Sequence, residues 1–537
     1  MIVGEITALG EAMSRLKRAF VGPLLGLGVI ATACAPTAPA SPAPGPSPQA
    51  QQLAETQTLT LGYPNVPANL DPHTNVGGTV RKFDMFETLV WLDDTGREVR
   101  PLLATEWRLV DPTTWRFTLR SGSKFHDGTP LTAEDVVFSW NRVTNPALRS
   151  QVPGNAPSIA SISAPDLATV EVKTKAPSPL LLRHIEQLAI VPKAYLERVG
   201  DEEFRAKPIG SGPFRFKEFR PEDRVVVTGW MEHPFRKPTL TEVTIRAIPD
   251  QTVRATGLRL KELDVGLQLG FDSAEALQRE GLEVVSRSTG VIGVLMDSVG
   301  GGGIEPGPIA DKRVRQALAY AVNREELAKG LFRGFSQPAG YLIREGVFGY
   351  NPEVKPYTFD PAKAKQLLTE AGYPNGFKQD LEYWNFSANI NNTALYLQDQ
   401  FKKNLNIDLE LKPLESAIFV QKIYKRQPIA SLYLGGLGTG TDADSSLVWY
   451  WSENPSFGKR YNNPEFDRVY LESTRELDPA KREKLLQQAI AILQEDPPWL
   501  GLVTNVDVSA WHKTVSGFTP RGFENGYPRF DEIKRVK

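Results

Sequence analysis

The sequence contains few of the residues that most often build metal sites and nucleophilic active sites. Its 537 residues include one cysteine and five histidines. A single cysteine can form neither an intrachain disulfide nor a paired-cysteine zinc site. The histidines show no H-x-x-x-H spacing; they are His73, His126, His184, His233 and His512. We therefore expect no metal site and no cofactor.

Hydrolase motifs are also scarce. The sequence has no G-x-S-x-G elbow and no H-E-x-x-H motif, which would supply a nucleophile or a zinc-bound water. The run His126-Asp127-Gly128 looks catalytic in isolation, but Asp followed by Gly is typical of a turn, and we interpret it as a turn. We predict that the protein is not an enzyme. A secreted hydrolase stays the main alternative class, because two carboxylates that are distant in sequence can converge in space.

The chain has no excess of charge of either sign. Lys and Arg total 62, Asp and Glu total 63, and the net charge is -1. Phosphate backbones are bound by basic surfaces, so we expect no nucleic-acid partner, although a local basic patch stays open. Hydrophobic residues make up 41% of the chain, which is enough to build real cores. The length favours two or three lobes.

Long apolar runs are missing except near the N-terminus. Basic residues between Arg15 and Arg18 precede an apolar stretch, residues 19–33, which is too short and too rich in Gly and Ala to span a bilayer. This order predicts an export signal over residues 1–33. Met13 is an alternative start, because the residues from Met13 onward would by themselves form the basic segment.

Cys34 follows the export signal directly. With Thr32 and Ala33 before it, the cysteine resembles a bacterial lipobox, in which the thiol is acylated, although Ala31 stands where Leu is usual. We predict lipidation at Cys34; plain cleavage after the A-x-A sequence is the alternative. Residues 34–57 are rich in Ala, Pro, Ser and Gln and would form a tether. We therefore expect a lipid-anchored protein on the cell-surface or periplasmic face of the cytoplasmic membrane.

From Thr58 onward, strand and helix signals mix without repeats. Leu59, Leu61 and Tyr63 alternate with polar residues, as in a half-buried strand. Helices are predicted where a capping residue precedes apolar residues at helical spacing; the capping residues are Thr132, Asp311, Asn323, Asp360 and Asp478. The mixture indicates an α/β or α+β protein with several lobes.

Several segments are together typical of one family. They are Asn69–His73, Phe86–Val90, Pro101–Trp107, Trp115–Arg120, Lys124–Val136, Gly210–Phe214, Asp311–Leu318 and Asp360–Gly372. In order and spacing, the chain from about Thr58 to the C-terminus resembles the extracellular solute-binding proteins, family 5, of peptide-type and nickel-type ABC importers. Each segment alone is a weak signal.

The resemblance implies an α/β, two-lobed periplasmic-binding-protein fold of class II, the flytrap type, with an extra small α+β domain. The implied division is lobe I at 58–84, 210–290 and 505–537, the inserted domain at 85–209, and lobe II at 291–504. It also implies capture of a peptide-like or small polar solute in the interlobe cleft and delivery to ABC permease subunits. A ligand sensor or chaperone on the same fold is an alternative. Flytrap closure needs no oligomer, so we expect a monomer.

The loop around Thr439 departs from the family pattern. Peptide-binding relatives usually have a Trp and then an Asp that pairs with the peptide's amino terminus. Here Gly435 or Gly436 stands at the Trp position and Thr439 at the Asp position, followed by a matching Asp442-Ala443-Asp444-Ser445. A buried ammonium needs a charged or fully hydrogen-bonded partner, which Thr cannot provide alone. Neutral glycosides, sugar conjugates or blocked peptides therefore fit better than free peptides, unless a shift in the alignment makes Asp442 the anchor or the Gly-rich run is simply a mobile loop.

Ligand-binding residues are predicted at three places. From the loop we expect Leu437, Gly438, Thr439, Thr441 and Asp442 to contribute. Tyr63 and Asn65 end the first strand, and Trp384, Asn385 and Phe386 end an apolar strand of lobe II. Asn385 would hydrogen-bond a polar ligand, and Trp384 would stack on a sugar or ring; the alternative is that these aromatics belong to the core. Further candidates are Tyr350, Trp449 and Trp451.

Overall fold

The computed structural model describes most of the chain after the predicted tether. The described residues are 52–74, 83–93, 96–150, 152–301, 303–385, 387–424, 428–438, 440–454, 459–520 and 529–537. They belong to one compact unit, Gln51–Lys537. The predicted export signal, Cys34, Phe386 and Thr439 lie outside the described residues, as does the side chain of Leu437.

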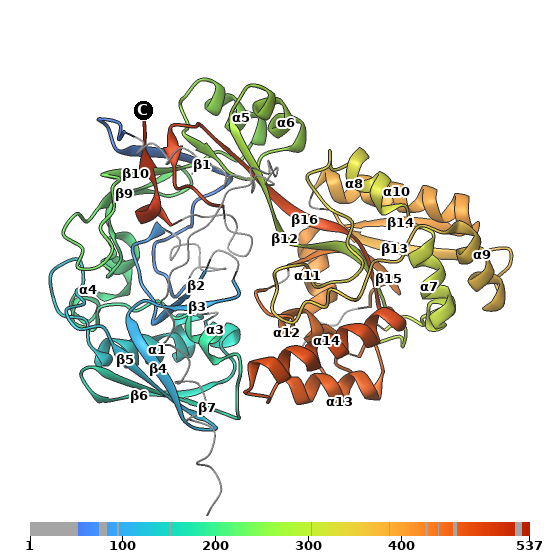
Figure 1. Ribbon diagram of the computed structural model, residues 1–537, viewed down its shortest axis with the longest axis horizontal. Helices are drawn as coiled ribbons and strands as arrows, with labels where there is room; N and C mark the ends of the chain where they lie inside the picture. Colours follow the sequence, from blue (N-terminus) through green and yellow to red (C-terminus); the bar gives the residue numbers. More distant parts are fainter. Residues whose placement is uncertain are drawn as a thin grey trace, which may run out of the picture. The chain divides into compact units, whose positions relative to one another are not determined.

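A mixed sheet of ten strands is the main element of this unit (Figure 1). Its strands, in spatial order, are β14 (Asp408–Leu414), β13 (Lys378–Trp384), β15 (Leu432–Gly438), β12 (Glu283–Met296), β16 (Trp499–Trp511), β11 (Val265–Gly266), β1 (Thr58–Tyr63), β10 (Glu242–Ala247), β9 (Arg224–Gly229) and β8 (Phe214–Arg220). Within it, β1, β10 and β11 are parallel and form the first strand group. The second strand group consists of β13, β14 and β15, which are also parallel to one another.

Strands β12 and β16 connect the two strand groups. They are antiparallel along nearly their whole length, from the Glu283–Trp511 pair to the Leu295–Trp499 pair. β11 borders the carboxyl end of β16, whereas β15 borders the carboxyl half of β12. The register shifts between Ser288 and Gly290, so that Thr289 forms a bulge where the neighbouring strands change. Bulges of this kind bend a strand pair and increase its twist.

A separate antiparallel sheet lies between β1 and β8 in the chain. Its strands, in spatial order, are β4 (Ala104–Asp111), β5 (Thr114–Leu119), β7 (Thr169–Thr174) and β6 (Ile159–Asp166). The hairpin of β2 (Val90–Leu92) and β3 (Val99–Pro101) precedes it. We call residues 88–206 the small-sheet region. Near the C-terminus, β17 (Val515–Ser516) pairs with β18 (Lys534–Arg535).

The helices belong to three parts of the chain. The small-sheet region contains α1 (Ala133–Thr144), η2 (Pro146–Leu148), α2 (Val152–Asn155), α3 (Leu181–Ile185) and α4 (Lys193–Ala206). In the first strand group, α5 (Gln251–Arg259) connects β10 to β11, and α6 (Phe271–Arg279) follows β11. The remaining helices are η3 (Gly307–Ala310), α7 (Lys312–Tyr320), α8 (Arg324–Gly330), α9 (Pro361–Glu370), α10 (Ala388–Leu405), α11 (Ser416–Tyr424), α12 (Asp444–Leu447), η4 (Val448–Tyr450), α13 (Pro464–Ser473), α14 (Pro479–Glu495) and η5 (Phe530–Glu532).

The capping residues predicted from the sequence begin the helices as expected. The side chains of Asp311, Asn323, Asp360 and Asp478 accept backbone N–H bonds at the starts of α7, α8, α9 and α14. Thr132 precedes α1, and its backbone N–H donates to Asp135 Oδ2 at 2.9 Å. Such bonds satisfy donors that a helix leaves without an internal partner.

Turn chemistry was also predicted correctly. Gly128 has a positive φ of 87°, and its N–H donates to Phe125 O at 2.9 Å, which closes the turn through His126-Asp127. At Gly210 and Gly212 the reason for glycine is space, because an added Cβ would lie 2.0 Å from Met85 O and 2.1 Å from Asp84 O, respectively. The backbone can pass so close only where no side chain intervenes.

Apolar residues on both faces of the β12–β16 pair form the cores. Ile292, Val294 and Met296 pack into the cluster that contains α7, α9 and α10. Val291 and Leu295, on the opposite face, pack into the cluster that contains α13 and α14. The first strand group and the small-sheet region have cores of their own. The alternation follows from the two-residue repeat of a strand.

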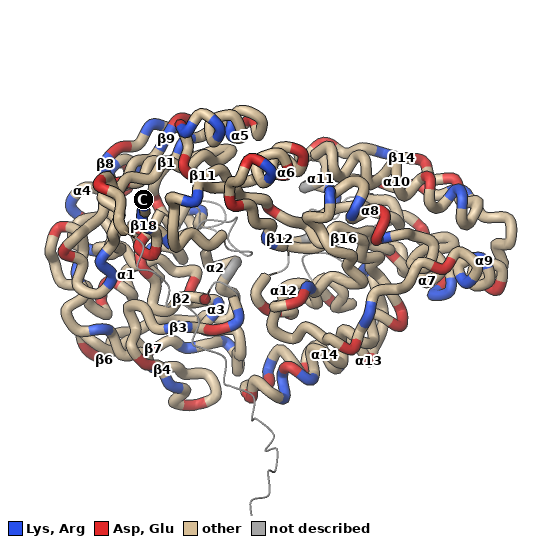
Figure 2. Tube along the Cα trace, turned by 45° about the horizontal axis from the view of Figure 1, so that its top comes forward, with Lys and Arg blue, Asp and Glu red and all other residues tan. Residues whose placement is uncertain are grey.

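Lys and Arg residues are interspersed with Asp and Glu residues along the described trace in the view of Figure 2. No helix in the described part of the chain is both long and apolar enough to cross a membrane.

Candidate ligand-binding site

The two strand groups point their carboxyl ends toward each other. β12 is antiparallel to β16 and therefore runs in the same direction as β11 and β1, whereas β15 runs against it. The carboxyl end of β11, at Gly266, lies level with Val284 of β12 across the sheet. The carboxyl end of β15, at Gly438, pairs with Gly290 of β12. Six residues of strand separate these levels, or roughly 20 Å at 3.3 Å per residue. In open α/β sheets ligands bind outside the carboxyl ends of the strands.

A polar cluster lies at the ends of β1 and β11. Gln268 Nε2 donates to Asp507 Oδ2 on β16 at 3.1 Å. Burial, and then the charge of Asp507, raises the pKa of Tyr63 to about 12. Gln268 has a φ of 51°, a left-handed conformation that costs a non-glycine residue energy and often marks functional positions. Tyr63, Gln268 and Asp507 thus form one polar cluster at the carboxyl ends of β1 and β11.

One cavity is lined by residues that follow both strand groups. It has a volume of about 550 Å³ and lies between the start of α6, the end of α8 and the start of α10. Gly270 and Phe271 contribute from the first group, and Ser387 and Asn389 from the segment after β13. The N-termini of α6 and α10 both border it, so backbone N–H groups are available there for polar ligand atoms.

Asp442 is committed to a buried ion pair. Arg482, on α14, donates from Nη1 to Asp442 Oδ2 at 2.6 Å and from Nη2 to Oδ1 at 2.8 Å. The two side chains are only 5% and 4% exposed. Oδ1 also accepts the N–H of Asp444 at 3.1 Å. Both carboxylate oxygens are therefore used within the protein, in the bidentate geometry that makes such pairs strong.

Arg183 connects the small-sheet region to the same loop. From α3, its Nη1 donates to Thr441 Oγ1 at 2.7 Å and to Gly96 O at 2.6 Å. Its Nε lies 3.5 Å from Asp442 Oδ2. Burial lowers the pKa of Arg183, while the charge of Asp442 acts in the opposite direction. The hydroxyl of Thr441, a predicted ligand contact, thus accepts a hydrogen bond from a buried arginine.

Trp384 packs against other aromatic side chains. Its ring stacks on Phe419 with centroids 4.6 Å apart and planes inclined by 2°, and Phe419 stacks in turn on Tyr433. The indole Nε1 donates to Ser416 Oγ at 3.0 Å. The ring is only partly buried. Its role as a ligand-stacking residue remains a prediction.

The other predicted residues lie at the ends of strands. Tyr63 is the last residue of β1 and is buried, whereas Asn65 is exposed. Asn385 is exposed directly after β13, and its N–H donates to Leu414 O at 3.0 Å. Gly438 ends β15 opposite Gly290. Tyr350, Trp449 and Trp451 are partly buried against the cluster that contains Trp499 and Ile490.

Sequence reasoning did not find Gln268, Asp507, Arg183 or Arg482. Each lies far from the 437–442 loop in sequence, and none stands in a recognisable motif. Asp507 and Gln268 meet only because β11 borders β16. The positive φ of Gln268 marks it as unusual, but this backbone angle is visible only in the structure and not in the sequence.

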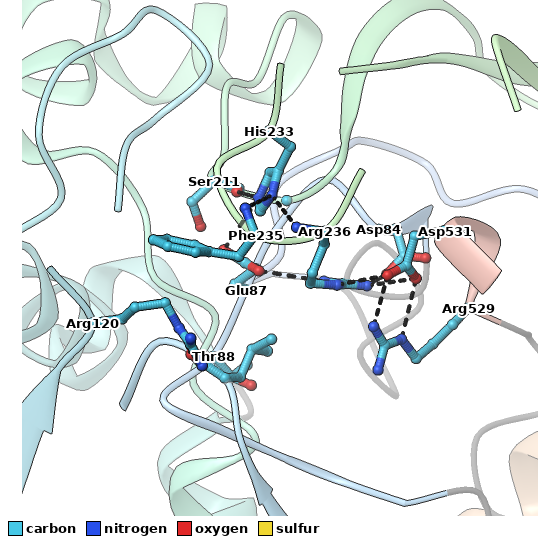
Figure 3. A network of polar contacts seen from close by, with 12 residues as sticks. Asp84, Glu87, Thr88, Arg120, Ser211, His233, Phe235, Arg236, Arg529 and Asp531 are labelled. Atoms are coloured by element: carbon cyan, nitrogen blue, oxygen red, sulfur yellow. Dashed lines mark hydrogen bonds and ion pairs between the residues drawn. The ribbon is translucent and has the colours of Figure 1, made fainter. Parts of the chain in front are cut away.

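A second buried network surrounds Arg236, as Figure 3 shows. Its guanidinium bonds Asp84 at 3.0 Å and Asp531 at 2.8 Å, and it lies 3.4 Å from Glu87. Arg529 donates to Asp531 at 2.7 Å. This network attaches the C-terminal segment to the residues that precede β2. Its polar groups bond one another, which is typical of a structural role.

The histidines are also used structurally. His126 accepts the N–H of Gly210 at Nδ1 (3.0 Å) and bonds Gly212 O through Nε2 (2.9 Å). His233 bonds Ser211 O through Nε2 at 2.9 Å. The described residues contain no group of three or more His, Cys, Asp or Glu side chains that could hold a metal ion.

Comparison with known proteins defines the class. The solved structure of HbpA2 from Haemophilus parasuis is similar with a TM-score of 0.80 and 24% identity, over 89% of this chain and 100% of that one. The murein tripeptide binding protein MppA of Escherichia coli is similar with a TM-score of 0.71 and 25% identity, over 90% and 99% of the two chains. The fold is thus the α/β, two-lobed fold of periplasmic binding proteins.

The family follows from the sequence. The profile of the bacterial extracellular solute-binding proteins, family 5, matches residues 98–458. The chain belongs to this family. It is also 26% identical over 450 residues to the glutathione-binding protein GsiB of Escherichia coli strain K12, which covers 79% of this chain and 84% of GsiB. These relatives are binding proteins.

Proposed function

We propose that this protein is the solute-binding subunit of an ABC importer, which captures a small polar or peptide-like solute and delivers it to a membrane permease. The observation that carries the proposal is the pair of opposed strand groups, joined by β12 and β16, with a cavity of about 550 Å³ lined from both. Family relatives named for binding glutathione and a murein tripeptide support a solute of this class.

We also propose the division of the chain that the resemblance implies. In it, lobe I consists of 58–84, 210–290 and 505–537, the inserted domain of 85–209, and lobe II of 291–504. The register shift between Ser288 and Gly290 supports a hinge at the boundary, since Gly290 pairs with Asn505 there. A bulge leaves the ladder locally incomplete, so bending at this point breaks few hydrogen bonds.

The ion pair of Asp442 narrows the ligand chemistry. An amino terminus anchored on Asp442 would have to displace Arg482 from a buried bidentate pair, which would leave a buried cation without its partner. Position 439, where relatives carry the anchoring Asp, is Thr in this sequence. The proposed solute is therefore a glycoside, a sugar conjugate or a blocked peptide, and a free amino terminus contributes little to its affinity.

Native mass spectrometry of the gently purified protein tests both the proposed solute binding and the proposed chemistry of the solute. We expect a bound small molecule that is lost on partial unfolding and whose mass fits a sugar or a blocked conjugate. Titration of a tripeptide and of its N-acetylated form should then give dissociation constants within threefold of each other. A free peptide as the copurified molecule, or tenfold weaker binding of the acetylated form, would contradict the ligand chemistry while leaving solute binding intact. Release of a hydrolysed product would favour the hydrolase alternative.

The lipid anchor and the monomeric state need separate tests. Labelling of growing cells with a radioactive fatty acid should mark the protein, and the Cys34→Ala variant should lose the label and leave the membrane fraction. Plain cleavage would give an unlabelled protein with an N-terminus at Cys34. Light scattering of the purified protein should give a mass near that of one chain.

A further inference from the structure

Arg344 is a cation without an anionic partner among the residues that the structure describes. Its Nε and Nη2 atoms are buried and have no hydrogen-bond partner among the described residues. Within the described part of the chain, the guanidinium donates from Nη1 to the backbone carbonyl of Glu345 at 3.3 Å. Burial lowers the pKa of Arg344, and no carboxylate offsets this effect. Buried guanidinium groups are normally paired, because an unpaired buried charge is costly.

Arg344 lines a cavity of about 350 Å³ beside the register shift of β12. Ser286 and Ser288 form the β12 side of this cavity, and Tyr341 and Tyr350 form part of the opposite wall. The two tyrosine rings are stacked, with centroids 6.1 Å apart and planes inclined by 13°. The cavity therefore combines a cation, hydroxyl groups and a flat apolar wall with the exposed carboxylate of Glu345. A mostly apolar lining with a few polar groups is usual for a small-molecule pocket.

This cavity lies on the face of the crossing strands that is opposite the Asp507–Gln268 pair. Thr504 and Val506 line it, whereas Asp507, which binds Gln268, points the other way because side chains alternate along a strand. The cavity's residues also come from both sides of the Ser288–Gly290 shift. A ligand bound here would contact the place where the strands bend.

We propose that this cavity is a second binding site, which takes a small organic anion: its carboxylate pairs with Arg344 and its apolar body lies against Tyr341 and Tyr350. The planar fork of a guanidinium matches a carboxylate, with two parallel N–H···O bonds from the atoms that lack partners. Inorganic oxyanions share the charge but cannot use the aromatic wall.

Isothermal titration calorimetry with benzoate, benzamide and inorganic phosphate tests this site in the intact protein. We expect benzoate to bind the wild type at least tenfold more tightly than it binds Arg344→Met, and benzamide, which is uncharged, to bind neither detectably. Arg259→Met removes an exposed arginine paired with Glu280 and should bind benzoate as the wild type does. Equal benzoate affinity of the wild type and Arg344→Met, or no benzoate binding at all, would overturn the site. Phosphate binding as tight as that of benzoate would overturn the organic ligand.

Thermal unfolding gives an independent readout that also controls for misfolding. In a buffer without small anions, Arg344→Met should melt at the wild-type temperature or above it, because the substitution removes a partly buried charge that no described carboxylate pairs with. Benzoate should then raise the melting temperature of the wild type and leave that of the variant unchanged, since only a ligand bound to the native state stabilises it. A large loss of melting temperature for the variant in the anion-free buffer would show that Arg344 already has a partner and would overturn the proposal.

Discussion

Arg482 holds both carboxylate oxygens of Asp442, and the two side chains are almost completely buried. Asp442 belongs to the 437–442 loop that the sequence predicts to bind ligand, and Arg482 contacts it from α14. The pair stabilises the loop from inside and leaves Asp442 no free oxygen for a ligand. The predictions below concern this pair and the contacts around it.

Removal of Asp442 should destabilise the protein strongly. Asp442→Ala leaves the guanidinium of Arg482 buried without its anion, and we expect unfolding free energy to fall by about 3–5 kcal/mol. Urea unfolding at pH 7 measures this. Asp380→Ala is the matched control, because its pair with Lys412 is exposed and should contribute about 1 kcal/mol or less. A small loss for Asp442→Ala together with abolished solute binding would identify Asp442 as a ligand anchor instead.

Arg183 should stabilise the contact between the small-sheet region and the loop. Arg183→Met leaves Gly96 O and Thr441 Oγ1 without this donor, and we expect a loss of about 1–3 kcal/mol. Arg97→Met serves as the comparison, because Arg97 forms an exposed pair with Glu483 at 3.4 Å that should contribute about 0–1 kcal/mol. If both variants unfolded at the same urea concentration, the buried role of Arg183 would be wrong.

Stability should decrease in mild acid because buried histidines must stay neutral. Burial lowers the pKa of His233 to about 4 and that of His126 to about 3. Both values lie below the unfolded value of about 6.5, so the folded state binds fewer protons. The contribution of these residues is complete above pH 6.5 and is lost as the pH falls toward 4, by up to about 1.4 kcal/mol per pH unit for each histidine.

The contribution of His126 can be tested with a variant whose side chain at position 126 cannot be protonated. His126→Gln offers a donor and an acceptor for Gly212 O and Gly210 N but has no charged form. Urea midpoints of this variant should depend less on pH between 6.5 and 4 than those of the wild type. The buried Glu87, whose pKa burial raises, acts in the opposite sense in both proteins and cancels in the comparison. Identical slopes would exclude His126 as the source.

We predict that position 212 requires glycine because the neighbouring backbone leaves no room for a side chain. An added Cβ would lie 2.1 Å from Asp84 O, so Gly212→Ala must move the backbone, and we expect a loss of about 1–3 kcal/mol. Gly154, in α2, has no atom within 4 Å of an added Cβ. Gly154→Ala should therefore be neutral or stabilise by about 0.5–1 kcal/mol. Thermal unfolding of the two variants distinguishes them, and equal melting temperatures would refute the steric argument.

Local features of the fold were predicted well. The caps at Asp311, Asn323, Asp360 and Asp478 and the turn at Gly128 depend on residues a few positions apart, and such short-range hydrogen bonds can be read from sequence. The candidate site was predicted only in part. The role of the loop around Asp442 in ligand binding stays a prediction, and the partners of Asp442 and Thr441 on α3 and α14 were not predicted.

The sequence by itself determined the positions of caps, turns and strands and, through its resemblance, the family. Only the tertiary structure decided the roles of individual polar side chains. Asp442 could have been a ligand anchor or an ion-pair partner, and nothing within several residues of it distinguishes the two. The packing of α14 against the loop brings Arg482 to Asp442 across 40 positions of chain. For Arg344, folding brings no such partner from the described residues. A charge takes its role from the charges that folding places beside it, because electrostatic energy depends on separation in space and on burial.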